Sequence, residues 1–135
     1  MGAEVLIYWG VIKSKELGTS FFLNNLRLPD RHVRLSSILV LSQIVYPGEQ
    51  IVPQLTRFER EFPLDATPQL TDTLSVIASP SAVNLLLHIG LYNAGPEDRY
   101  VIRALRKIGI PKSHQALKTL KSSYQNKLKL LEGLE

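Results

Sequence analysis

Residues 96–131 read PEDRYVIRALRKIGIPKSHQALKTLKSSYQNKLKLL, and this stretch predicts two helices joined by a short turn. Its apolar residues recur at steps of three and four, the spacing of one helical face. They are Val101, Leu105, Ile108, Leu117, Leu120, Tyr124, Leu128 and Leu131. Gly109 is a natural end for the first helix and Pro111 a natural start for the second. We therefore expect a C-terminal helical pair over residues 97–132.

The rest of the chain repeats this punctuation. Prolines divide it into pieces whose apolar residues again step by three and four, and Asp30 is a good N-cap for a piece that is apolar nearly all round. The sequence predicts an all-α fold, a single compact helical bundle of about six or seven helices in one domain over residues 1–135. An N-terminal strand within Val5–Trp9 is the alternative, and Gly18 is expected to end the first helix. No internal repeat is evident.

One predicted helix is clearly amphipathic. Ile51, Leu55 and Phe58 continue to Phe62 at steps of four, three and four. The charged residues of this helix are expected to face solvent. They are Arg57, Glu59, Arg60 and Glu61.

Composition limits the class of protein. The chain is 44% hydrophobic and 21% charged, as in a globular protein rather than a disordered one. It has no cysteine, which excludes disulfides and thiolate chemistry. The apolar run Val5–Ile12 follows an acid and lacks the features of a signal peptide, and neither apolar segment is long enough to span a bilayer. We expect a soluble, cytoplasmic protein without membrane attachment.

Catalytic patterns are missing. His32, His88 and His114 are isolated from any second ligand at zinc spacing, and His88 is expected to be partly buried. The glycines fall singly, so no phosphate-cradling loop is present. The sequence therefore predicts no enzyme activity, no metal site and no cofactor.

Positive charge is concentrated near the C-terminus. Residues 99–129 hold nine of the sixteen Lys and Arg and no acid, so the other 104 residues carry seven cations against twelve acids. Surface helices normally intersperse the two signs, because Glu–Lys pairs stabilise them. An acid-free window of this length favours binding of a polyanion.

We predict a nucleic-acid-binding set of residues in this window. Arg99, Arg103 and Arg106 stack on one side of a helix, where each guanidinium group can hold a phosphate. The full set is Arg99, Arg103, Arg106, Lys107, Lys112, Lys118, Lys121, Gln125 and Lys129. A smaller cluster, Arg27, Arg31 and Arg34, either joins this set in space or is an ordinary helix start, and we favour the second interpretation.

Two resemblances follow from the C-terminal residues. The segment Leu105–Leu120 resembles a helix-turn-helix, with Gly109 and Ile110 at the turn and Ser113–Leu120 as the second helix. That resemblance implies a regulator that reads duplex DNA.

The chain as a whole looks like the small subunit of a multi-subunit CRISPR surveillance complex. The proline-punctuated helices and the basic residues carry this resemblance. It implies a non-catalytic, all-helical subunit in antiviral defence, present in several copies, with basic helix faces along the path of the displaced DNA strand. The apolar run Val5–Ile12 is also what a separately made terminal domain of a large subunit would show.

Three functions remain open at this point. The favoured one is a non-enzymatic subunit of a ribonucleoprotein assembly that holds the DNA or RNA backbone electrostatically, with other protein subunits as partners. The second is a helix-turn-helix regulator. The third is a helical protein-interaction module with a basic docking face.

Overall fold

The computed structural model describes residues 15–44, 48–92 and 98–133, and these residues form helices joined by short connections. The α-helices are α2 (Lys15–Asn25), α3 (Arg31–Ile44), α4 (Val52–Glu61), α5 (Thr67–Ile77), α6 (Pro80–Tyr92), α7 (Asp98–Ile108) and α8 (Pro111–Gly133). A short 3₁₀ turn, η1 (Glu49–Ile51), leads into α4. The described residues contain no strand, so the predicted all-α class is confirmed for them. The predicted strand alternative lies outside the described residues.

Several helix ends follow from local chemistry. The Asp30 carboxylate caps α3 by accepting hydrogen bonds from the backbone N–H groups of His32 (2.9 Å) and Val33 (3.4 Å). The Ser79 hydroxyl does the same for the N–H of Ala82 at the start of α6 (3.1 Å). Gly109 ends α7 with a φ of 65°, a conformation that costs glycine little.

The prediction that Gly18 ends a helix is wrong. Helix α2 runs from Lys15 to Asn25 and passes through Gly18. Phe22 within this helix and Leu26 directly after it are almost fully buried in the core. Burial of two large apolar side chains outweighs the roughly 1 kcal/mol that a glycine costs inside a helix.

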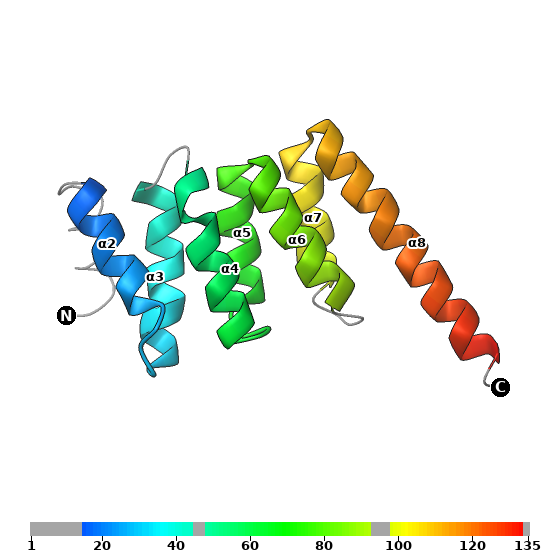
Figure 1. The fold of residues 1–135 in the computed structure, drawn as a ribbon, viewed down its shortest axis with the longest axis horizontal. Helices are drawn as coiled ribbons and strands as arrows, with labels where there is room; N and C mark the ends of the chain where they lie inside the picture. The colour runs from blue at the N-terminus through cyan, green and yellow to red at the C-terminus, as the bar shows by residue number, and fades with distance from the viewer. Residues whose placement is uncertain (1–14, 45–47, 93–97, 134–135) are drawn as a thin grey trace.

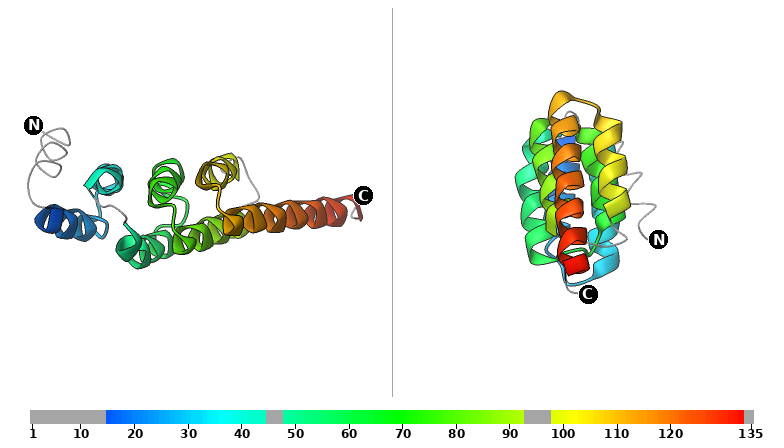
Figure 2. Two further views of the ribbon diagram at one scale, coloured as in Figure 1. Left: turned by 90° about the horizontal axis from the view of Figure 1, so that it is seen from above. Right: turned by 90° about the vertical axis from the view of Figure 1, so that its right-hand side faces the viewer.

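The helices are arranged in two layers. Helices α3, α5 and α7 lie side by side in one layer, and α2, α4, α6 and α8 lie in the other (Figure 1; Figure 2, left). The chain crosses between the layers at each connection, so the bundle is drawn out into a row. Most of the core lies between the layers. Its largest fully buried side chains are Phe22, Ile38, Val40, Leu41, Ile51, Leu55, Leu70, Leu74, Leu86, Ile89, Leu105 and Leu120.

The expectation of no internal repeat needs correction, because equivalent residues recur at an interval of 31. Leu55, Leu86 and Leu117 occupy the same place in α4, α6 and α8. The same interval relates core residues Phe58, Ile89 and Leu120, and it relates Leu70 and Leu74 of α5 to Val101 and Leu105 of α7. It also relates Ala78 to Gly109, both with positive φ (55° and 65°). From α4 onward the fold is a stack of similar helical hairpins.

Small buried residues set the contact between neighbouring helices of the α3, α5 and α7 layer. Thr73 and Ala104 hold equivalent places, 31 residues apart, and both are nearly inaccessible to solvent, as is Ser37 of α3. The Thr73 hydroxyl lies 3.2 Å from the Ile38 carbonyl of α3 and 2.9 Å from its own helix's Gln69 carbonyl. Stacking in this direction places α7 and α8 at the C-terminal end of the row, where α8 continues past the other helices (Figure 1).

Candidate nucleic-acid interface

Helix α7 presents a row of arginines to solvent. Val101 and Leu105 are fully buried, and Ala104 is nearly so. Successive residues of an α-helix are rotated by about 100°, so a row at steps of four and three lies along one side. Arg99, Arg103 and Arg106 therefore lie on the side of α7 opposite Val101 and Leu105, and all three are exposed. This arginine row is the outer surface of the α3, α5 and α7 layer at its last helix.

No carboxylate among the residues that the structure describes forms an ion pair with the arginine row. The two ion pairs between described residues both involve Asp65, far from α7 in sequence. Glu59, Glu61 and Asp72 make no ion pair with the C-terminal cations that the structure describes. The contacts of Arg99 are with its neighbour Tyr100, whose hydroxyl it reaches at 3.1 Å and whose ring centre lies 5.0 Å from its guanidinium carbon. Among the residues that the structure describes, no carboxylate therefore offsets the positive charge of the row.

Helix α8 carries the second set of polar candidates. Ser113, Ala116 and Leu120 are buried and mark the side of α8 that packs on the other helices. The exposed candidates on α8 are Lys112, Lys118, Lys121 and Gln125. Lys129 belongs to the same helix, but its side chain lies outside the described part of the structure.

The structure does not gather the predicted residues on one face. By the same helical rotation, Lys118 and Gln125 lie on the side of α8 opposite its buried Ala116 and Leu120, and the arginine row lies opposite the buried side of α7. Lys112 is exposed in the first turn of α8. Lys107 is also exposed, on α7. The predicted cations are therefore divided between the arginine row on the outer side of α7 and exposed lysines on α8, which belongs to the other layer.

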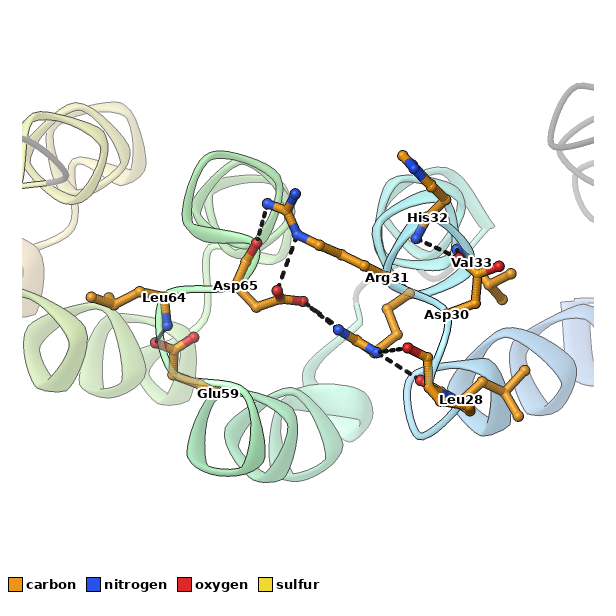
Figure 3. A network of polar contacts seen from close by, with 10 residues as sticks. Leu28, Asp30, Arg31, His32, Val33, Glu59, Leu64 and Asp65 are labelled. Atoms are coloured by element: carbon orange, nitrogen blue, oxygen red, sulfur yellow. Dashed lines mark hydrogen bonds and ion pairs between the residues drawn. The ribbon is translucent and has the colours of Figure 1, made fainter.

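The smaller basic cluster has a structural role. The buried Arg34 donates to Asp65 Oδ2 from Nε (3.3 Å) and Nη2 (3.1 Å), and to the carbonyls of Leu28 (2.8 Å) and Pro29 (2.9 Å) from Nη1. Its guanidinium carbon lies 4.0 Å from the centre of the Phe62 ring. Arg31 donates to the other oxygen of the same carboxylate at 3.1 Å (Figure 3). These contacts tie α3 to the connection between α4 and α5. They favour the interpretation in which Arg31 and Arg34, at the start of α3, are separate from the predicted nucleic-acid-binding set.

Glu59 was expected to face solvent, and this prediction is wrong. The residue is only 7% exposed. Its Oε1 accepts a hydrogen bond from the Leu64 N–H at 3.1 Å, near the end of α4 (Figure 3). Burial raises the pKa of Glu59, the Leu64 hydrogen bond opposes this shift, and the Asp65 charge adds to it. Glu59 is buried because α6 packs beside α4, which the periodicity of α4 alone does not show.

His88 also differs from expectation. It was expected to be partly buried but is exposed on α6, with its ring centre 5.1 Å from that of Tyr92.

Among the described residues there is no group of three or more His, Asp or Glu that could hold a metal ion. In the same part of the chain, no helix is both long enough and apolar enough to cross a membrane.

No protein-family model matches this chain, and neither a curated protein nor a solved structure shows detectable similarity to it. Any assignment of function therefore depends on the geometry described above.

Proposed function

We propose that the chain is a non-enzymatic helical subunit that holds nucleic acid by its phosphate backbone, with the arginine row of α7 as the principal contact. The observation that carries this proposal is the row itself: Arg99, Arg103 and Arg106 are exposed, lie on one side of a helix and have no described carboxylate partner. Arginine suits this task because its planar fork holds phosphate oxygens in pairs.

The burial of α8 supports a polyanion over a membrane surface as the target. A helix that lies on a membrane needs an exposed apolar side for the lipid. Over residues 111–126, the part of α8 whose side chains are described, the apolar side is occupied, since Ala116 and Leu120 are buried in the core. Charge without an exposed apolar stripe favours an electrostatic, sequence-independent contact.

Membership in a larger assembly is the most specific part of the proposal. The resemblance to CRISPR small subunits supports it through architecture alone. An arginine row in one layer and exposed lysines on α8 in the other suit a subunit with different neighbours on its two sides, one of them nucleic acid.

The repeat gives an alternative explanation for the helix-turn-helix resemblance. The α7–α8 connection has a positive-φ residue followed by a proline start, and so does the α5–α6 connection, through Ala78 and Pro80. The turn at Gly109 is thus a feature of the stack, and it does not favour a duplex-reading regulator.

A protein-interaction module with a basic docking face is a second candidate. Stacked helical hairpins present long surfaces that bind other chains in many proteins. The 31-residue hairpin repeat is the observation that favours this candidate. An acidic protein segment would then replace the nucleic acid on the arginine row.

A salt titration tests the proposal. We expect a short fluorescent oligothymidylate to bind at low salt, and the logarithm of the association constant to fall with the logarithm of salt concentration with a slope of roughly −2, as for three neutralised phosphates. Fluorescence anisotropy measures both quantities. A flat response, or polyglutamate of equal charge that competes as well as the oligonucleotide, would contradict nucleic acid as the partner.

A further inference from the structure

A groove runs between α4 and α6, on the layer opposite the arginine row. Two hollows of about 400 and 590 Å³ lie next to each other there, and they share Glu59, Arg60 and His88. The larger hollow is also lined by Leu64, Ile89 and Tyr92. Leu64 and Tyr92 are 44% and 83% exposed, so apolar and aromatic surface is available at this end of the groove.

The repeat explains why a groove exists at this place. Between α6 and α8, Gly90 allows Leu120 to approach so closely that a Cβ on Gly90 would lie 2.8 Å from Leu120 Cδ2. Glu59 is the equivalent of Gly90, 31 residues earlier, and Ile89 is the equivalent of Leu120. A glutamate side chain takes the space that glycine leaves free, so α4 and α6 cannot close in the same way.

The groove contains an unsatisfied acceptor. Glu59 lines both hollows, and its Oε2 is buried without a hydrogen-bond partner among the described residues. Its Oε1 is already held by the Leu64 N–H. A buried carboxylate oxygen without a donor is costly, and an incoming donor that carries positive charge relieves this cost best.

We propose that this groove binds an extended segment of a partner protein that places a lysine or arginine side chain on Glu59 Oε2. The methylene stem of such a side chain packs along apolar surface while its charged end reaches the acid. Leu64 receives an apolar neighbour of the basic residue, and the exposed Tyr92 ring offers a face to the cation. This site is separate from the proposed nucleic-acid contact and gives the chain a second, protein-directed surface.

The test uses a blocked peptide as probe, acetyl-Leu-Arg-Leu-amide, titrated into the ¹⁵N-labelled full chain and followed by NMR. We expect saturable shifts at the Leu64 amide, which is bonded to Glu59, and at His88 and Ile89. The same peptide with citrulline, which has the shape of arginine without its charge, should bind about tenfold more weakly. Absence of saturable shifts at millimolar peptide, or equal binding of the citrulline peptide, would overturn the proposal.

The variant Glu59→Gln keeps an acceptor for the Leu64 N–H and replaces the unsatisfied oxygen with a donor. It should weaken the arginine peptide about tenfold. Glu61→Gln is the matched control, because it makes the same change on an exposed residue of the same helix. The site would be contradicted if both variants lowered the affinity for the arginine peptide equally, or if neither variant lowered it.

Stability shows whether Glu59→Gln is still folded. The pKa of Glu59 is raised in the folded protein, so the fold holds that proton more tightly than the unfolded chain does. Stability associated with Glu59 is therefore greatest in acid and is lost as the pH rises through the folded pKa. Near neutral pH the glutamine variant should be at least as stable as the natural chain, and a large loss of stability would show that the buried carboxylate serves the fold rather than a ligand.

Discussion

Replacing Arg99, Arg103 and Arg106 together with glutamate should lower the affinity for oligothymidylate by about a hundredfold or more at low salt. Each arginine removed takes away a charge-assisted contact to a phosphate, and each glutamate adds repulsion in its place. All three residues are exposed and make no described ion pair, so the fold should tolerate the change. Fluorescence anisotropy measures the affinity, and circular dichroism checks that the helices remain.

The matched control separates the arginine row from net charge. Replacing Arg27, Arg57 and Arg60 with glutamate changes the net charge by the same amount, and all three are exposed residues outside α7 and α8. We expect the control to lose only a few-fold in affinity, through long-range electrostatics. If the two triple variants lose affinity equally, the binding follows overall charge, and the arginine row is not a site.

The largest expected effect on stability comes from Arg34→Ala. This change removes a buried cation and leaves the Leu28 and Pro29 carbonyls without their donor. It also leaves Asp65, only 18% exposed, with Arg31 alone. Breaking a buried ion pair from one side costs about 3–5 kcal/mol, a large part of the stability of a domain of this size. Urea unfolding followed by circular dichroism gives the free energy of unfolding.

Arg31→Ala is the control for this second prediction. Arg31 pairs with the same carboxylate, but its side chain is 60% exposed. Exposed ion pairs contribute about 1 kcal/mol or less. Similar losses from the two variants would show that the burial of Arg34 is not what makes it important.

The individual helices were predictable because their signals are local. Asp30 and Ser79 cap the helices that follow them, and Gly109 ends α7, as the residue types indicate. The stack was not predicted, because the positions that recur every 31 residues share burial in the core, while the residue types at those positions mostly differ. Leu55, Leu86 and Leu117 are identical, but in other places only apolar character persists, as with Phe58 and Ile89.

For the candidate nucleic-acid interface, the sequence predicted which residues share one side of a single helix, but not how residues of different helices are placed relative to one another. Steps of four and three place Arg99, Arg103 and Arg106 on one side of α7, and their exposure agrees with this. The separation of this row from Lys118 depends on how α7 packs against α8, which the spacing within each helix does not contain. The pairing of Arg34 with Asp65 and the burial of Glu59 also depend on contacts between helices.

The most direct test of the account observes the arginines themselves. Arginine side-chain Nε–Hε signals report separately on each guanidinium group in an NMR titration with oligothymidylate. We predict saturable shifts for Arg99, Arg103 and Arg106, and none for Arg31 and Arg34, whose Nε donors are held by Asp65. Binding that leaves the three α7 signals unchanged would contradict the central claim that this row is where the chain holds nucleic acid.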